Sequence, residues 1–384
     1  MSLHPADLAD AVGRSIADGR GPDPGTLRRI AAERGELLGD RAGAEDARGL
    51  ATRLVGLGPL TPLVADDGVT DVLVNGDGSV WVDRGRGAER STVTVAADDL
   101  RPLAVRLAGV AGRRLDDAQP WVDGVLPGGV RLHAVLPPLV DGPHLSLRIA
   151  RRRPGGVAAL VADGASSPEG GVLLGSMVRA RLGLLVTGGT GAGKTTVLGA
   201  LLADCPPHER IVVVEDVREL DPDHPHVVRL QGRPANVEGA GEVTLAALVR
   251  QALRMRPDRL VVGEVRGPEV RELLAALNTG HDGGAGTLHA NGPEEVPARL
   301  EALGALAGMP RQAVHAQLAG AVGAVVHLVR DGPVRRLDRV GVPSVRPDGI
   351  VQVRTAVTDG PDGLRPGPAR EDLRTRLAAA GCEA

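Results

Sequence analysis

The chain contains no phenylalanine, no tyrosine and only two tryptophans among its 384 residues. Aromatic side chains usually bury much of the apolar area of a core, so these cores must be built from Val, Leu, Ala and a few Ile and Met. Hydrophobic residues still make up 42% of the chain, which is ordinary for a globular protein. The length favours two or three domains, each able to bury a core of its own.

Cysteine and long apolar runs are also scarce. Cys205 and Cys382 lie far apart, and neither belongs to a C-x-x-C pair, which argues against a disulfide framework or a zinc site and fits a reducing cytoplasm. No secretory signal is recognisable, and no segment approaches the roughly 20 apolar residues of a membrane span. We therefore expect a cytoplasmic protein whose membrane association is peripheral.

An excess of positive charge is missing as well. The formal net charge is −3, which gives no basic field to attract nucleic acid. Proteins that bind single strands combine a basic groove with stacking aromatic side chains, and this composition offers neither feature. Direct binding of nucleic acid is therefore not expected.

Lysine occurs once, as Lys194, beside 44 arginines. It lies in LGLLVTGGTGAGKTTVLGALL (182–202), which predicts an apolar strand over 182–186, a glycine-rich turn, and an apolar helix from about Lys194. The spacing is G-x-x-x-x-G-K-[ST] in the strand–loop–helix context that this motif requires. A compact ammonium on a flexible stem suits a phosphate in a way that a planar guanidinium does not.

This stretch predicts a site for a nucleoside triphosphate. The glycines let successive backbone N–H groups converge on phosphate oxygens, and the helix N-terminus adds partial positive charge. Lys194 should reach the β- and γ-phosphates, and the Thr195 hydroxyl should ligate Mg²⁺. The predicted nucleotide-binding residues are Gly188, Gly189, Thr190, Gly191, Ala192, Gly193, Lys194, Thr195 and Thr196.

The chain before this site divides into three predicted parts. Residues 1–50 form a helical segment with apolar residues on one face. Residues 51–150 form an α+β domain, in which Asn75–Gly78 marks a hairpin between two alternating runs and a helix covers 98–111. The basic run that ends in Pro-Gly-Gly begins a linker over 151–165.

The remainder predicts an α/β domain over 166–330, which contains the triphosphate site, and a C-terminal extension over 331–384. Short apolar strands alternate with helices in the first range, which calls for a parallel sheet with helices on its faces. Two helices are predicted there, over 242–256 and 268–278. The extension reads as two edge strands or hairpin arms, a polar stretch and a short helix.

Two acids follow predicted strands of this sheet. Glu215 ends one strand, and Glu264 ends another, followed by Arg266. The carboxyl ends of parallel strands face the crevice where ligands bind, so both acids should lie beside the phosphate loop. A carboxylate there can hold Mg²⁺, or orient and deprotonate the attacking water, and position alone assigns neither role.

Histidine and arginine add further candidates. His281 and His289 flank a glycine-rich segment, where a histidine could bond a γ-phosphate oxygen; without a third ligand their spacing does not predict a metal site. Arg233, Arg254 or Arg266 could supply positive charge to the transition state, but spacing alone singles out none of them.

These segments together resemble a known family. The ordered set GGTGAGKTT, VEDVREL, LRMRPDRLVVGEVRG and NTGHDGGAGTLHAN is similar to the Walker A loop, Asp box, atypical Walker B and His box of the secretion ATPase superfamily of type II and type IV secretion systems and type IV pili. LRMRPDR, GEVRG and TGHDG resemble most the TadA/CpaF branch, which drives the tight-adherence (Flp) pilus. GLGPLTPLVADDGVTDVLVNG, GRRLDDAQPWVDGVLPGG and HLSLRIA are similar to that branch's N-terminal domain.

The resemblance covers roughly residues 50–330 and implies a RecA-like P-loop ATPase domain behind an α+β N-terminal domain. It implies that Lys194 and Thr195 hold the phosphates and Mg²⁺, that Glu215 is the catalytic carboxylate that activates water, and that Glu264 is the Walker B acid supporting the metal. His281 and His289 match the His-box residues, and Arg148 matches an interdomain arginine that can reach the nucleotide. Arg233 and Arg266 also lie in family-like stretches.

The implied function is Mg²⁺-dependent ATP hydrolysis by a hexameric ring, which drives a platform protein of the inner membrane from the cytoplasmic side. Such a motor powers assembly of an Flp or type IV-type pilus, or protein secretion. Two alternatives stay open: a nucleic-acid motor for conjugative DNA transfer, and a non-hydrolysing, nucleotide-gated scaffold. Intact Lys194, Glu215 and Glu264 disfavour the scaffold.

Overall fold

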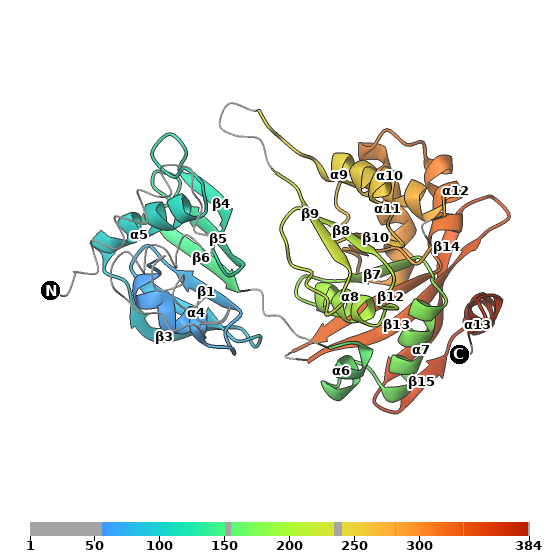
Figure 1. Cartoon of the computed structure of the whole chain (residues 1–384). Coiled ribbons are helices and arrows are strands. Elements are labelled where there is room, and N and C mark those ends of the chain that lie inside the picture. The colour runs from blue at the N-terminus through green and yellow to red at the C-terminus, as the bar shows by residue number, and fades with distance from the viewer. Residues whose placement is uncertain (1–55, 150–154, 234–239, 281, 333, 383–384) are drawn as a thin grey trace. The chain divides into compact units, whose positions relative to one another are not determined.

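A computed structural model describes residues 56–149, 155–233, 240–280, 282–332 and 334–382 (Figure 1). The predicted helical segment over 1–50 lies outside the described residues. The chain divides into two compact units, Met1–Arg151 and Arg152–Ala384. Each unit is described by itself below.

The first unit contains a six-stranded antiparallel sheet with the strand order β3-β2-β1-β6-β5-β4. The hairpin predicted around Asn75–Gly78 is confirmed: it joins β1 to β2, and Val74 pairs with Val80. Valines alternate inward along both strands, so one face of the hairpin is apolar and packs into the core. The strands are β1 (Asp71–Val74), β2 (Ser79–Asp83), β3 (Ala88–Thr94), β4 (Trp121–Val125), β5 (Val130–Val135) and β6 (His144–Ile149).

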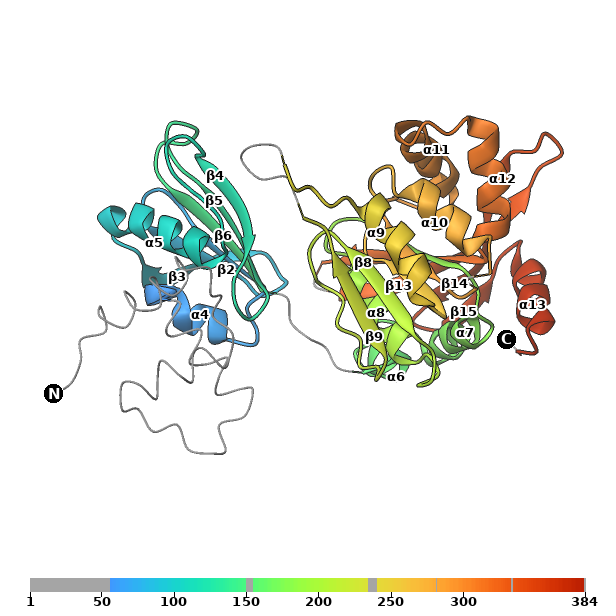
Figure 2. The same ribbon diagram turned by 45° about the horizontal axis from the view of Figure 1, so that its top comes forward.

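One helix, α5 (Ala97–Val110), covers a face of this sheet (Figure 2). It confirms the helix predicted over 98–111, and its buried leucines follow the predicted spacing. The core that it closes contains valine, leucine, alanine and isoleucine without an aromatic ring. Trp121 instead lies on the edge strand β4 and is 48% exposed. Two short elements precede the sheet, η1 (Gly58–Leu60) and α4 (Thr61–Ala65).

The second unit is organised around a nine-stranded sheet with the order β15-β14-β13-β12-β7-β11-β10-β8-β9. Six neighbouring strands, from β12 to β9, are parallel, which confirms the predicted α/β class. The edge strand β9 was not predicted, because its side chains are half exposed and its run is less apolar. The parallel strands are β7 (Leu184–Gly188), β8 (Ile211–Glu215), β9 (Val227–Gln231), β10 (Arg259–Val262), β11 (Ala285–Leu288) and β12 (Ala324–Asp331).

Helices cover both faces of this sheet (Figures 1 and 2). Successive side chains of β8 point to opposite faces of the sheet. Val213 packs with one set of helices, and Val212 and Val214 pack with the other. The first set is α6 (Val157–Ala162), α7 (Pro168–Arg179), α8 (Lys194–Ala203) and α13 (Arg370–Ala379), and the second is α9 (Leu245–Ala252), α10 (Val270–Leu277), α11 (Val296–Leu306) and α12 (Arg311–Ala321).

Two of these helices correspond to predicted ones. The helix predicted over 242–256 is α9 followed by the short η2 (Leu253–Met255), and it begins where the Thr244 hydroxyl accepts the Ala247 N–H. The helix predicted over 268–278 is α10. Helix α6 lies in the range predicted as a linker and packs on α7 and α8. A further short element, η3 (Pro293–Glu295), precedes α11.

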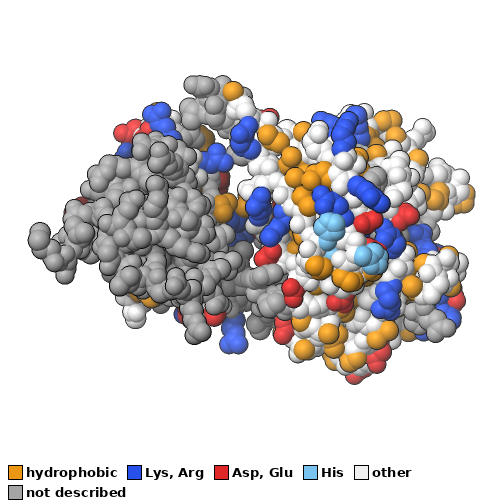
Figure 3. Space-filling model, viewed as in Figure 1, with side chains coloured by type: hydrophobic (Ala, Val, Ile, Leu, Met, Phe, Trp, Pro, Cys, Tyr) orange, Lys and Arg blue, Asp and Glu red, His pale blue; other side chains and the backbone are white. Residues whose placement is uncertain are grey.

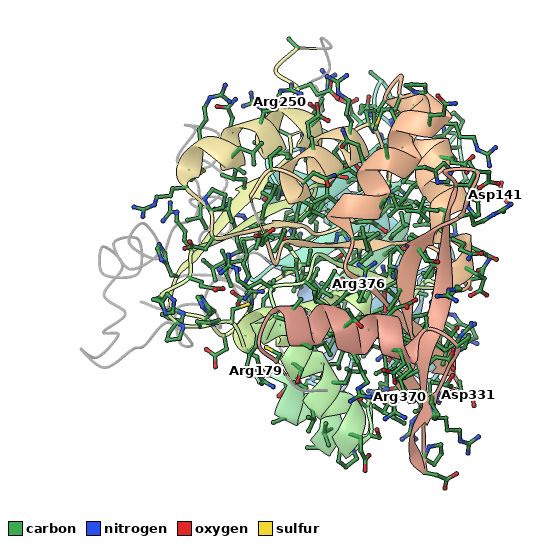
Figure 4. All side chains as sticks on the ribbon, turned by 90° about the vertical axis from the view of Figure 1, so that its right-hand side faces the viewer. Asp141, Arg179, Arg250, Asp331, Arg370 and Arg376 are labelled. Atoms are coloured by element: carbon green, nitrogen blue, oxygen red, sulfur yellow. The ribbon has the colours of Figure 1, made fainter. Side chains whose placement is uncertain are left out.

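The range after residue 330 continues the same sheet. Strands β13 (Val334–Val345), β14 (Val351–Gly360) and β15 (Gly363–Pro366) add to it antiparallel to one another. Helix α13 then packs beside α7 (Figure 4). Arg376 fixes α13 by donating to the carbonyls of Val322, Gly323 and Pro343 at 3.3, 3.2 and 2.7 Å. No described helix has the length and apolar character needed to cross a membrane.

Candidate active site

The glycine-rich loop connects β7 to α8 as predicted. Gly188, Gly191 and Gly193 have φ angles of +151°, +72° and +93°, values that side chains of L-residues rarely allow. Space is limiting too, because a Cβ on Gly188 would lie 2.6 Å from the Leu328 carbonyl oxygen. The backbone therefore curls over the N-terminus of α8 only because these positions are glycine.

Lys194 begins α8 and points back under the loop. Its side chain is only 8% exposed, and Nζ donates to the carbonyls of Gly188 and Gly189 at 3.0 and 3.1 Å. Burial lowers the pKa of Lys194, while the charges of Glu264 and Glu219 act in the opposite direction. The ammonium is thus held at the mouth of the loop, where a phosphate would enter.

An acid and a histidine face this ammonium from neighbouring strands. Glu264 follows β10 and His289 follows β11, and the strand order places β11 between β10 and β7. His289 Nε2 lies 2.9 Å from Glu264 Oε1, and its two ring nitrogens lie 3.4 and 3.5 Å from Lys194 Nζ. The Thr287 hydroxyl donates to the Gly263 carbonyl at 2.6 Å, which fixes the turn that carries Glu264.

Arg266 extends this row of charges. It pairs with Asp216, and its Nη1 lies 3.8 Å from Glu264 Oε2. Asp216 follows β8 directly, so carboxylates from two strand ends share one guanidinium. The visible face of the second unit carries basic, acidic and histidine side chains intermingled (Figure 3).

Glu215 and Glu219 occupy different positions around the loop. Glu215 is buried, and its Oε1 accepts the N–H groups of Glu219 and Leu220 at 3.1 and 3.0 Å. It therefore closes the turn after β8, which leads Glu219 to the phosphate loop. There Thr195 Oγ1 donates to Glu219 Oε2 at 3.3 Å. Burial raises the pKa of Glu215 to about 7, which suits a proton acceptor near neutral pH.

Two side chains of this site were missed by sequence reasoning. Glu219 is the acid that reaches the predicted Mg²⁺ ligand, Thr195, and its signal was its place four residues after Glu215 in VEDVREL. Arg335 donates from Nε to the Gly191 carbonyl at 2.8 Å. No pattern in the sequence distinguishes it among 44 arginines.

Three other predicted arginines have contacts of their own. Arg148 belongs to the first unit and pairs with Asp71 at 3.0 Å. Arg233 donates from Nε to the Gly241 carbonyl at 2.7 Å, at the neck of the loop that follows β9. Arg254 donates to the Arg250 carbonyl on α9. Their roles at a nucleotide stay predictions.

His281 lies outside the described residues. The adjacent Asp282 offers its carbonyl to Arg181 at 3.1 Å, just before β7 begins. Asp282 therefore lies at the amino ends of the parallel strands, whereas the phosphate loop lies at their carboxyl ends. Among the remaining loop residues, Ala192 is buried, and Gly189, Thr190 and Thr196 are exposed.

The oxygen donors of the site fit a magnesium ion. Mg²⁺ is commonly held by one or two carboxylates together with substrate phosphates, and Thr195, Glu219 and Glu264 supply a hydroxyl and two carboxylates at the rim of the loop. Among the residues that the structure describes, no group of three or more His, Cys, Asp or Glu side chains is placed to hold a metal by itself.

Comparison with known proteins gives consistent matches. The family model "Type II/IV secretion system protein" matches residues 53–362. A protein of Mycobacterium tuberculosis (strain H37Rv) that is named for conjugal transfer is 59% identical over 308 residues, covering 78% of this chain and 88% of the relative. The conjugal transfer protein TrbB of Rhizobium radiobacter is 32% identical over 295 residues, covering 74% and 87%.

Among solved structures, the chain is similar to the pilus retraction motor PilT with bound ADP. The TM-score is 0.52 at 18% identity, and the match covers 84% of this chain and 87% of that one. At this level of identity the likeness concerns the fold alone.

Proposed function

The chain belongs to the type II/IV secretion system protein family, the secretion traffic ATPases, and we propose that it binds Mg²⁺–ATP at the loop 188–195 and hydrolyses it to ADP and phosphate. The site lies at the carboxyl ends of the parallel strands, where ligands bind in open α/β sheets. ATP hydrolysis in this chain would power a secretion or pilus machine.

One observation carries this proposal: three chemically distinct groups converge from three neighbouring strands on one loop. Lys194, His289 and Glu264 form a continuous row, with 3.4 and 2.9 Å between successive side chains. An ammonium at the loop can stabilise charge on the phosphates. A carboxylate in hydrogen-bond reach of a histidine can orient water for attack.

The acidic groups then take separate roles. Thr195, Glu219 and Glu264 are the residues that would hold Mg²⁺, whose chemistry is to neutralise charge that develops on the phosphate oxygens. Glu215 is our candidate for accepting the proton of the attacking water, because its pKa of about 7 lies near neutral pH. Arg266 holds Asp216 and Glu264 in place.

The kind of motor and its partner are proposed from the resemblance of this chain's motifs to a family branch. We propose a hexameric motor of the TadA/CpaF type at the inner face of the plasma membrane, acting on a platform protein of an Flp or type IV-type pilus or of a secretion system. Residues Arg148 and Arg233, and His281 and His289 of the His box, are carried into this proposal from the family pattern.

A second candidate is transport of DNA between cells. It is favoured by the names of two relatives, which refer to conjugal transfer. Stimulation of ATP hydrolysis by single-stranded DNA, declining steeply with salt, would favour it over the pilus motor. No stimulation by DNA, with stimulation by a membrane platform protein, would favour the pilus or secretion motor.

The test is Lys194→Ala, compared with Arg374→Ala on α13, where the exposed Arg374 side chain pairs with nearby Glu371. Loss of the ammonium should lower Mg²⁺-dependent ATP turnover on the order of 10²-fold or more. Arg374→Ala should retain turnover. Normal hydrolysis by Lys194→Ala would show that ATP is not hydrolysed at this loop. Tight ATP binding without turnover by the assembled wild-type protein would support a non-hydrolysing scaffold.

A further inference from the structure

Two arginines stand opposite each other on the hairpin formed by β12 and β13. Arg330 and Arg335 are direct cross-strand partners in the antiparallel register. Like charges in this position repel and destabilise a hairpin. Hydrogen-bond acceptors beside the guanidinium groups offset this repulsion.

Both arginines of this pair lie against the phosphate loop. Arg335 Nε donates to the Gly191 carbonyl at 2.8 Å, and its Cδ lies 3.4 Å from where a Cβ on Gly193 would stand. Arg330 donates from Nε to the Gly332 carbonyl at 3.0 Å, and its Nη1 lies 3.1 Å from the Cβ position of Gly191.

The backbone of the hairpin touches the same loop. Leu328 pairs with Gly188 across β12 and β7, and its carbonyl oxygen fills the space beside that glycine. The hairpin therefore lies along the outer side of the loop at Gly188, Gly191 and Gly193. These are the three loop glycines with positive φ.

The hydrogen bond from Arg335 acts on the groups that bind phosphate. The C=O and N–H of one peptide point in opposite directions, so holding the Gly191 carbonyl toward the hairpin turns the Ala192 N–H toward the inside of the loop. There it lies 3.3 Å from the Gly189 carbonyl, a long hydrogen bond that a phosphate oxygen can replace. Converging N–H groups of this kind form the anion site.

We propose that Arg335 is a positioning residue for the phosphate loop, and that the Arg330–Arg335 pair couples binding of a nucleoside di- or triphosphate to the β12–β13 hairpin. This inference rests on the proposed nucleotide site. Both side chains lie against the loop at Gly191, so phosphates that order the loop also stabilise the hairpin, and the hairpin strengthens binding. Coupling between two sites is necessarily reciprocal.

The first experiment measures Mg²⁺–ADP affinity by calorimetry in wild type and in two variants. Arg335→Met keeps the aliphatic stem beside Gly193 but removes the donor and the charge, and it should weaken ADP about 10-fold or more. Arg335→Lys restores the charge and one donor and should recover part of the loss. The matched control is Arg365→Met, on the edge strand β15, where Arg365 pairs with Asp362.

The second experiment follows amide hydrogen exchange with and without saturating Mg²⁺–ADP. In wild type, ADP should slow exchange in both α8 and the hairpin around 328–335. In Arg335→Met, ADP should still protect α8 but no longer the hairpin. A general loss of structure would change the protection of α8 and of the hairpin alike. A thermal melt establishes that each variant is folded.

Three results would overturn the inference. Unchanged ADP affinity in Arg335→Met would show that the arginine does not position the loop. Hydrogen exchange in the hairpin that is the same with and without ADP in wild type would show that the two sites are not coupled. Equal loss of affinity in Arg335→Lys and Arg335→Met would show that neither the donor nor the charge of Arg335 matters. Failure of wild type to bind Mg²⁺–ADP would instead refute the proposed function itself.

Discussion

Replacing Glu215 with glutamine should make the second unit more stable at alkaline pH. The Glu215 side chain is 4% exposed. Burial raises the pKa of its carboxyl group from an ordinary 4.5 to about 7, against the effect of hydrogen bonds from the backbone of Leu220 and Glu219. Glutamine keeps an oxygen that can accept both N–H groups and never acquires a charge.

The sign follows from proton linkage. Because the pKa is higher in the folded protein than in the unfolded chain, the stabilisation that protonation gives is fully present below about pH 4.5 and is lost as the pH rises through about 7. Each pH unit between these values corresponds to about 1.4 kcal/mol. Glu215→Gln should therefore exceed wild type by about 3 kcal/mol in free energy of unfolding at pH 8.5, and by less than about 1 kcal/mol at pH 5.

Thermal and urea unfolding of nucleotide-free protein at pH 5 and pH 8.5 measures this difference. A gain of about 3 kcal/mol corresponds to roughly 6–12 °C in Tm for a unit of this size. Glu371→Gln is the matched control, since its side chain is 77% exposed and surface changes of this kind have small effects. Equal gains at both pH values, or none at pH 8.5, would refute the reasoning. The same variant should lose ATP turnover if Glu215 accepts the proton of the attacking water.

Two further predictions concern Glu219 and Arg376. Glu219→Gln should raise the Mg²⁺ concentration that half-activates ATP hydrolysis by roughly 10-fold, because it removes a carboxylate charge beside Thr195. A magnesium titration of turnover measures this concentration, and an unchanged midpoint would exclude Glu219 from the metal site. Arg376→Met should lower the free energy of unfolding by about 2 kcal/mol, because the carbonyls of Val322, Gly323 and Pro343 lose their donor. Urea unfolding measures this loss, with Arg374→Met as the control. Equal stability of the two variants would contradict the prediction.

The parts of the site that could be predicted from sequence are those fixed by local pattern. The glycine spacing before Lys194 determines a loop whose geometry few other residues allow, and the structure has that loop. Apolar runs that end in an acid identify strand ends, and parallel strands bring such ends to one edge. Glu264 therefore lies near Lys194 even though 70 positions separate them in the printed sequence.

The parts that could not be predicted depend on contacts between distant segments. Apolar periodicity reports how much of a strand is buried, not which strand it pairs with. The sequence predicts two edge strands or hairpin arms after residue 330 without naming the strand that they join, and the structure pairs β13 with β12. Arg335 is 144 positions from Gly191, and its contact follows from that pairing alone.

The contrast between one lysine and 44 arginines has a structural counterpart at this site. Two arginines near the loop donate to carbonyl or carboxylate oxygens: Arg335 to the Gly191 carbonyl and Arg266 to the Asp216 carboxylate. A guanidinium fork suits such acceptors. Lys194 instead lies under the loop, where one compact ammonium donates to two carbonyls and keeps its third N–H for a phosphate. A planar guanidinium is larger than an ammonium and would fill the space that the phosphate needs, so the chemistry of the loop favours lysine at this position whatever the composition of the remaining chain.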